Sequence, residues 1–351
     1  MTLDQLHQQI SEAISSLDCE RIWPDFKPLR FALYNEEKCF FDGNYIEKTD
    51  DFCANTSIVF REEQIAIWKV EGEPNVPVLT SKIVHEMFHG YQMQQKWDCW
   101  ADEMEALYRY QYRTENLSLK LRENELLLSI LDHFDPAAYQ ELLSHRKLRS
   151  IRYPYEFSYE TKVEEIEGTA NYIEWMVLTQ LDKQQAATMV THMRTIMTQP
   201  EYLCPIRISS YFTGALMTYA MIRAGDYTFT PVERPAIHYV MKMTQTSDGS
   251  FTEKENCCQK VSSAIAAFHK VSEAAIQAAL ARNEVVINGP LELLGVNIYD
   301  ARFYRGYVTS RYFLQYQDVS GPHTLSGNYI VKMADERTIA CVYSWDGVLS
   351  Q

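Results

Sequence analysis

The sequence predicts an α+β protein with a small N-terminal β-sheet, a mainly helical middle and a C-terminal β-rich region, either a β-meander or a small barrel. Three observations predict this class. Short β-branched and aromatic runs lie before residue 71, with a turn signal at Asp42-Gly43-Asn44. Apolar residues then recur at helical spacing until about residue 284. From Val285 onward, β-branched and aromatic runs return, separated by Gly, Asp and Asn. The expected divisions are residues 1–78, 79–284 and 285–351.

The first division, residues 1–78, is expected to contain one helix followed by a small sheet. Residues 2–17 have the pattern of an amphipathic, polar helix, and residues 23–28 form a proline-containing connector. The β-propensity of the following runs predicts strands at residues 29–34, 38–41, 56–60 and 64–70.

The middle division is expected to be a succession of helices. Residues 101–132 contain neither Pro nor Gly and mix charged with apolar residues at helical spacing, which predicts one long helix. Asp135-Pro136 then opens a helix that ends near residue 149, before an aromatic cluster around Pro154. Further helices are expected at residues 158–181, 184–198, 209–224, 231–243 and 261–282.

Charge and cysteine usage limit the classes of partner and compartment. The 351 residues carry 33 Lys and Arg against 47 Asp and Glu, a net charge of −14. Such a charge disfavours nucleic acid and anionic membranes as partners. The first residues lack the basic and apolar segments of a signal peptide. The eight cysteines include no CxxC pair, so we expect reduced thiols and a cytoplasmic protein. The sequence does not predict an oligomeric state.

Residues 81–91, SKIVHEMFHGY, contain an HExxH pattern formed by His85, Glu86 and His89. On a helix, positions i and i+4 share one face, so the two imidazoles can bind one Zn²⁺ from the same side. Glu86 is placed to take a proton from a water activated there. Helix start signals precede this segment at Asn75, Pro77 and Thr80. The arc opposite the histidines is apolar, formed by Leu79, Ile83, Val84, Met87, Phe88 and Tyr91. The alternative is a chance match on an ordinary core helix.

A catalytic zinc site requires three protein ligands and one open position. An HExxHxxGxxH pattern would supply a third histidine, but Gln95 stands at that position. The helix at residues 158–181 instead offers polar side chains along one helical face, namely Glu160, Glu164, Glu167, Asn171 and Glu174. A charged helical face is usually solvated, which is the alternative interpretation of this pattern.

Residues 167–174, EGTANYIE, resemble the glutamate-ligand helix of the gluzincin clan, as found in the aminopeptidase N family. In that helix a glycine follows the glutamate ligand, with Tyr at +5 and Glu at +7, which are the places of Tyr172 and Glu174. The resemblance implies a zincin-like catalytic region with Glu167 as the third ligand. In thermolysin-like enzymes, an acidic residue four positions further holds the first histidine, and Asn171 occupies that position here. Glu164 is the alternative ligand, or a receptor for the amine of a substrate.

A second segment, Tyr211 to Leu216, resembles the tyrosine-x-x-glycine segment of the same aminopeptidase family. The resemblance implies that Tyr211 donates a hydrogen bond to the oxyanion of a tetrahedral intermediate. The alternatives are a packing role for Tyr211, or Tyr219 or His238 as the donor.

The chain also departs from that family. From His89 to Glu167 is a step of 78 positions, much longer than in the family, and the GxMEN strand that grips a free amine is absent. The resemblance therefore implies a gluzincin-type zinc metallopeptidase and does not extend to aminopeptidase specificity, so endo- and exo-cleavage both stay open. We expect zinc-dependent hydrolysis of a peptide substrate. The alternatives are a non-catalytic binding protein of the same fold and a zinc hydrolase of a non-peptide substrate.

Overall fold

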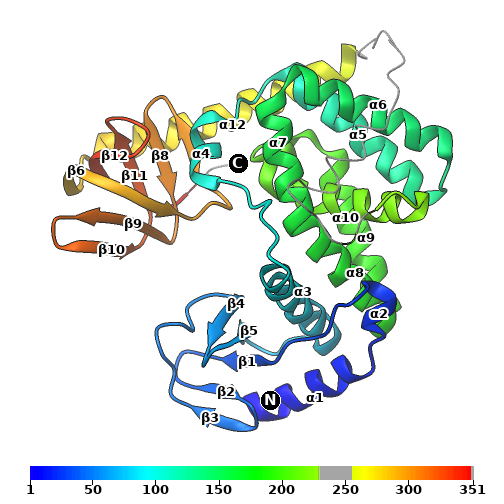
Figure 1. Ribbon diagram of the computed structural model, residues 1–351. Coiled ribbons are helices and arrows are strands. Elements are labelled where there is room, and N and C mark those ends of the chain that lie inside the picture. The colour runs from blue at the N-terminus through cyan, green and yellow to red at the C-terminus, as the bar shows by residue number, and fades with distance from the viewer. Residues whose placement is uncertain (228, 230–254, 349–351) are drawn as a thin grey trace.

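The structure is a computed structural model that describes residues 1–227, 229 and 255–348 (Figure 1). It has an N-terminal sheet with helices, a helical region and a C-terminal sheet, so the α+β class is confirmed. The helix expected at residues 231–243, and with it His238, lies outside the described residues.

The N-terminal region pairs a helix with a mixed five-stranded sheet of order β3-β2-β1-β5-β4. The four expected strands are present, and β1 pairs parallel with β5. A fifth strand, β3, arises because Asp42 and Gly43 both adopt positive φ and turn the chain back on itself. The elements are α1 Leu3–Ser15, α2 Cys19–Ile22, β1 Phe31–Tyr34, β2 Cys39–Phe41, β3 Asn44–Ile46, β4 Thr56–Phe60 and β5 Glu63–Lys69.

Helix α3, Val76–Gln94, carries the HExxH pattern and packs between this sheet and helix α8 (Figure 1). The Asn75 side chain caps it by accepting from the Val78 amide, and Pro77 lies in its first turn, where a missing amide hydrogen costs nothing. Gly90 lies inside the helix. A Cβ there would lie 2.4 Å from Leu29 Cδ1 and 2.7 Å from Ser57 Oγ, so glycine lets the helix approach the sheet closely.

The helical region differs from prediction at two places. Residues 101–132 form two helices because Tyr110 is extended and its hydroxyl is held by buried Glu160. Residues 154–159 start a helix, with Pro154 in its first turn. The elements are α4 Glu103–Arg109, α5 Thr114–Asp132, α6 Pro136–Arg152, α7 Pro154–Val163, η1 Glu164–Gly168, α8 Thr169–Leu181, α9 Lys183–Thr198, η2 Pro200–Leu203, α10 Ile206–Ala224 and α12 Glu255–Arg282.

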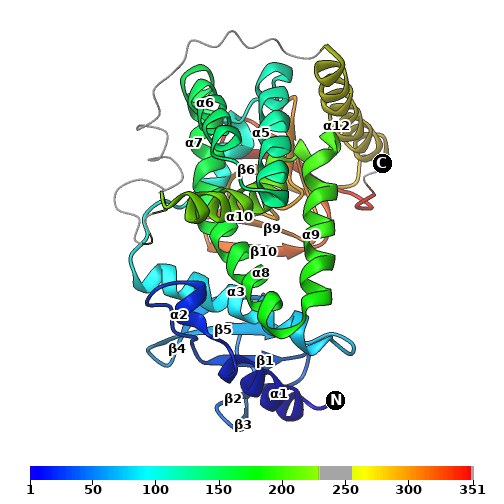
Figure 2. The ribbon, with the colours of Figure 1, turned by 90° about the vertical axis from the view of Figure 1, so that its right-hand side faces the viewer.

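The C-terminal region is an antiparallel seven-stranded sheet of order β10-β9-β6-β12-β11-β8-β7. The long strand β6 lies between β9 and β12, so the order is not that of a simple meander. Helix α12 joins this sheet to the helical region, since it packs on Ile330 and Trp345 at one end and near Leu117 at the other (Figure 2). The strands are β6 Val285–Val296, β7 Arg302–Tyr304, β8 Tyr307–Ser310, β9 Phe313–Asp318, β10 Gly321–Ser326, β11 Tyr329–Met333 and β12 Thr338–Ser344.

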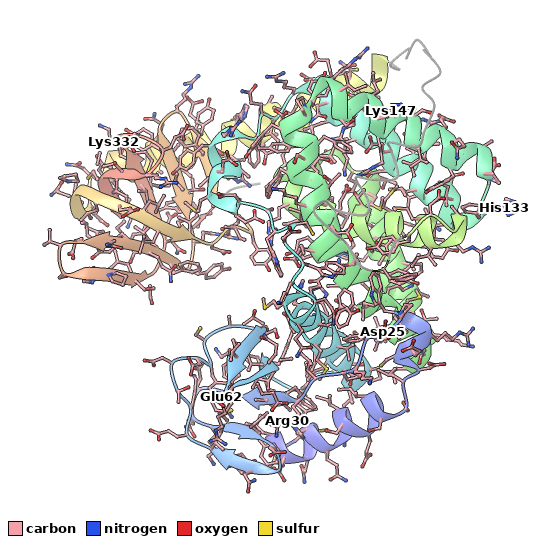
Figure 3. All side chains as sticks on the ribbon, in the orientation of Figure 1. Asp25, Arg30, Glu62, His133, Lys147 and Lys332 are labelled. Carbon is pink, nitrogen blue, oxygen red and sulfur yellow. The ribbon has the colours of Figure 1, made fainter. Side chains whose placement is uncertain are left out.

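Charged side chains are spread over the periphery of all three regions, as Arg30, Lys147 and Lys332 illustrate (Figure 3). The eight cysteines form no disulfide. Within the described residues, every helix is too short or too polar to span a bilayer.

Candidate metal centre

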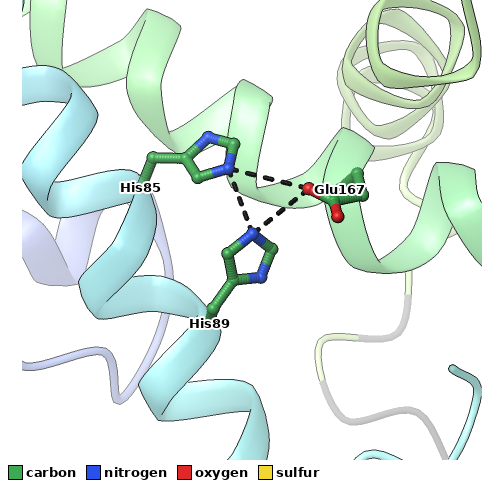
Figure 4. A group of neighbouring side chains, drawn as sticks. All are labelled: His85, His89 and Glu167. Carbon is green, nitrogen blue, oxygen red and sulfur yellow. Dashed lines mark hydrogen bonds and ion pairs between the residues drawn. The ribbon is translucent and has the colours of Figure 1, made fainter. Parts of the chain in front are cut away.

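Three side chains from two elements converge between α3 and η1 (Figure 4). His85 and His89 lie one turn apart on α3, and Glu167 faces them from η1. The two Nε2 atoms are 3.1 Å apart, and Glu167 Oε2 lies 3.2 Å from His89 Nε2 and 3.8 Å from His85 Nε2. Two imidazoles and one carboxylate, largely buried, are the donor set of a candidate metal centre.

The spacing of these atoms fits a zinc ion. In a tetrahedral site with bonds of about 2.0–2.1 Å, neighbouring ligand atoms lie roughly 3.3–3.4 Å apart. The three separations here, 3.1, 3.2 and 3.8 Å, bracket that value. Three protein ligands would leave the fourth position of the tetrahedron open, which is the pattern of a catalytic zinc site.

Side chains behind the histidines orient both imidazoles. His89 Nδ1 lies 2.8 Å from the Oε1 atom of Gln92, whose amide group donates to Ile166 O and Thr169 Oγ1. Glu174 Oε2 lies 3.3 Å from the buried Nδ1 of His85, an ion-pair distance without good hydrogen-bond alignment. Contacts of this kind fix the tautomer that points Nε2 toward a metal.

Glu167 is held as a carboxylate. Burial opposes its ionisation, but His89, His85 and Arg207 outweigh that effect and lower the pKa of Glu167 well below 4.5. Its second oxygen, Oε1, accepts a hydrogen bond of 2.9 Å from Arg207 NH2. Arg207 also pairs with Glu103, so one guanidinium ties the candidate ligand to α4. An ionised carboxylate with one oxygen free toward the histidines is the form a metal needs.

Glu86 lies beside the candidate ligands without being one of them. Burial raises the pKa of its carboxyl group, and the like charges of Glu167 and Glu174 add to this, against the lowering effect of the two histidines. In the described part of the chain, no hydrogen bond reaches its carboxylate. A carboxyl group with a raised pKa and free oxygens is suited to exchange protons with a neighbouring molecule.

A π-helical turn sets the direction of Glu167. Between α7 and α8, η1 places one extra residue in the turn and so rotates the following residues about the axis. The predicted common face of the acidic residues is therefore wrong. Glu160 and Glu164 point to one side, where both pair with Lys120, and Glu167 and Glu174 point to the histidines.

A glycine contact holds η1 against α10. A Cβ on Gly168 would lie 2.4 Å from the Gly214 Cα, and a Cβ on Gly214 would lie 2.4 Å from the Glu164 carbonyl oxygen. Gly168 belongs to the glutamate-ligand segment, and Gly214 to the tyrosine-x-x-glycine segment. The two segments singled out in the sequence thus meet backbone to backbone.

Glu164 and Asn171 do not join the centre. The Glu164 carboxylate is fully buried and pairs with Lys120 and Arg146, so neither the alternative metal ligand nor an amine receptor is placed there. Asn171 makes no hydrogen bond within the described residues. Glu174 instead occupies the position beside His85 that was expected for Asn171.

Tyr211 lies on α10, one turn after Arg207. Its hydroxyl accepts a hydrogen bond of 3.0 Å from Arg207 NH2 and lies 3.4 Å from the Tyr299 hydroxyl, which comes from the C-terminal region. Burial raises the pKa of Tyr211, with Glu167 adding to the effect, so the phenol is neutral at ordinary pH. Tyr219, two turns further along α10, instead packs against Trp175.

Three functional residues are not predicted from the sequence: Gln92, Arg207 and Glu103. Gln92 follows His89 by three positions, so helical spacing could have placed it beside the histidine. Arg207 precedes Tyr211 by four positions on α10, which is a similar signal. No sequence signal identifies Glu103, because its contact with Arg207 joins residues 104 positions apart.

Comparison with known proteins gives no match: no family model fits the chain, and no curated protein or solved structure is significantly similar to it. The geometry of the centre is therefore the basis for its function.

Proposed function

We propose that this protein is a zinc-dependent peptidase of the gluzincin type, with His85, His89 and Glu167 as the metal ligands. The observation that carries the proposal is the convergence of three donor atoms at separations that suit tetrahedral zinc. A zinc ion would supply Lewis acidity, making water acidic near neutral pH and polarising the scissile carbonyl.

Glu86 is assigned the proton transfers. As a carboxylate beside the two histidines, it accepts the proton of the attacking water and passes it to the leaving amine. General acid–base catalysis is best served by a pKa near the working pH, and burial of Glu86 raises its pKa in that direction.

Tyr211 is assigned to the oxyanion. Its hydroxyl stays protonated, and Arg207 at 3.0 Å keeps the phenol on the side of Glu167. A neutral phenol can donate to the negative charge that develops on the carbonyl oxygen. Arg207 lies over the rings of Tyr211 and Tyr299, which limits the movement of both.

The neighbouring sheet favours a peptide as the substrate. Strand β4 is the edge of the N-terminal sheet and packs on α3, the helix that carries both histidines. An exposed strand edge can pair with an extended peptide through main-chain hydrogen bonds. A non-peptide substrate would make no use of this edge.

The test combines metal content with turnover. Protein stripped with a chelator and reloaded with zinc should contain one zinc per chain and cleave members of a quenched-fluorescence peptide library, with cleavage lost on stripping and restored by zinc. Zinc at one equivalent with no cleavage of any member would favour the non-catalytic binding protein. Absence of bound zinc would overturn the proposal.

A further inference from the structure

A pocket of about 270 Å³ lies next to the centre, between α4, the start of α10, α12 and the C-terminal sheet. Aromatic side chains form a large part of its wall, and they include two contacting pairs, Tyr108 with Phe303 and Tyr112 with Phe268. Arg207 also lines it, and the same side chain binds Glu167. The pocket therefore begins one side chain away from the candidate metal ligands.

Arg302, at the start of β7, brings to this pocket a positive charge that pairs directly with no carboxylate of the described residues. Its guanidinium stacks on Phe268 at 4.4 Å and makes one long contact of 3.5 Å with the Phe268 carbonyl. Its Nε is buried and has no hydrogen-bond partner. Among the described residues, no carboxylate forms an ion pair with it, and Asp300, two positions earlier, is engaged by Arg311.

The charged residues that line the pocket leave an excess of one positive charge. They are Glu103, Arg207 and Arg302, and Glu103 pairs with Arg207. Burial lowers the pKa of His269, which keeps that imidazole neutral near pH 7. A buried guanidinium without a counter-charge is costly unless an anion completes it. The lining thus suits a ligand that has one negative charge and an apolar body.

We infer that this pocket binds the C-terminal carboxylate of a peptide, with Arg302 as the receptor and the aromatic wall holding an apolar terminal side chain. The inference rests on the proposed function, because the pocket is separated from the candidate ligand Glu167 by one side chain, Arg207. A guanidinium binds a carboxylate through two parallel hydrogen bonds, and the terminal nitrogens of Arg302 make one long contact of 3.5 Å, with the Phe268 carbonyl, among the described residues. The protein would then remove short C-terminal fragments.

The size of the pocket limits what fits beyond the scissile bond. A volume of about 270 Å³ is slightly below the range of roughly 300–1,000 Å³ typical of small-molecule sites. It suits one apolar residue with its carboxylate. A free arylalkyl carboxylic acid has the same carboxylate and apolar body, so the experiment must distinguish it from a peptide C-terminus.

The test measures binding apart from turnover. Fluorescein-labelled pentapeptides ending in Phe, Tyr or Leu are titrated by fluorescence anisotropy into the full chain carrying Glu86→Gln, once with a free C-terminal carboxylate and once with a C-terminal amide. The acid forms should bind at least about tenfold more tightly than the amides. Adding Arg302→Gln should remove that preference, whereas Arg305→Gln, at an exposed position after the same strand, should retain it.

Several results would overturn the inference: equal affinity for acid and amide, a preference that survives Arg302→Gln, or no binding at all. Displacement of the peptide by 3-phenylpropionate at a matching affinity would assign the pocket to a free carboxylic acid instead. Should Arg302→Gln unfold, the acid–amide comparison in the parent protein still decides. Cleavage of the peptide library without a preference for the free acid would refute this inference alone. A preference for the free acid without cleavage would refute the proposed catalysis alone.

Discussion

Each histidine of the candidate centre is held from behind by a side chain that is not itself a ligand. Gln92 contacts His89 and also ties α3 to Ile166 of η1 and to Thr169, the first residue of α8. Because Glu167 belongs to η1, the same glutamine orients one ligand and positions the element that carries another. Substitution of Gln92 should therefore lower the affinity for zinc.

Gln92→Leu is expected to weaken zinc binding by roughly 10- to 100-fold, the usual effect of removing such a supporting contact. Competition with a chromophoric chelator measures the affinity. Gln94→Leu makes the same chemical change at an exposed position of the same helix and is the control. Equal zinc affinity in the two variants would contradict the role given to Gln92.

Glu86→Gln should retain one zinc per chain and lower kcat by about 10²- to 10⁴-fold, because it removes the proton acceptor and leaves the three ligands in place. Steady-state cleavage of a library hit, together with metal analysis of the same preparation, gives both quantities. Turnover at the wild-type rate would refute the assignment of Glu86.

At the scale of elements, the π-helical turn η1 is the feature of this helix that the sequence did not predict. The HExxH pattern and helical spacing located α3 and its two histidines, and the resemblance to a glutamate-ligand helix selected Glu167. Helical spacing also put Glu160 and Glu164 on the same face as Glu167, because periodicity assumes a regular helix. The extra residue in η1 depends on packing against Gly214, which lies 46 positions after Gly168 in the sequence.

Gly214→Ala tests this packing, since the new Cβ would meet the Glu164 carbonyl oxygen at 2.4 Å. Overpacking of this kind costs about 1–3 kcal/mol of unfolding free energy, and zinc affinity should fall as η1 shifts. Urea unfolding measures the first and chelator competition the second. Thr179→Ala, exposed on α8, should change stability by less than about 0.5 kcal/mol. A Gly214→Ala protein as stable as this control would contradict the close contact.

A buried network of three cations and three carboxylates joins α5, α6, α7 and η1. Its members are Lys120, Arg146 and Arg149 with Glu123, Glu160 and Glu164. All six side chains are at most 1% exposed, so the acidic face of the predicted helix is neither solvated nor wholly directed at the metal. Because charges of opposite sign are equal in number, no charge of the network is left buried without a partner, which is the arrangement that costs most.

The network should make stability depend on pH. Burial opposes ionisation of Glu160, but Arg149 and Lys120 outweigh it and lower its pKa from 4.5 to about 2. A folded pKa below the unfolded one means that this stabilisation is present above pH 4.5 and is lost as the pH falls toward 2.

Glu160→Gln should reduce the free energy of unfolding by about 3–5 kcal/mol at pH 6, because it leaves buried cations short of a partner. The loss should shrink as the pH is lowered to 3. Urea denaturation across that range measures it. Glu125→Gln, an exposed pair with Arg122, should cost at most about 1 kcal/mol and show no such trend. A loss for Glu160→Gln that is independent of pH would contradict the network.

At the scale of the molecule, the order of sheet, helical region and second sheet followed from local patterns, because turn signals and hydrophobic period are local properties. The long-range contacts did not follow. Tyr299 meets Tyr211 from 88 positions away, and Arg302 faces a pocket built largely from α4, α10 and α12. The C-terminal sheet thus supplies side chains beside a centre whose ligands all come from the first half of the chain.

The most direct test of the account is X-ray absorption at the zinc edge on protein loaded with one equivalent of zinc. The account predicts a first shell of two imidazole nitrogens and light oxygen atoms at about 2.0–2.2 Å, with one imidazole lost from the signal in His85→Ala and in His89→Ala. A sulfur shell, or a spectrum that neither substitution changes, would place the metal elsewhere and contradict the centre formed by His85, His89 and Glu167.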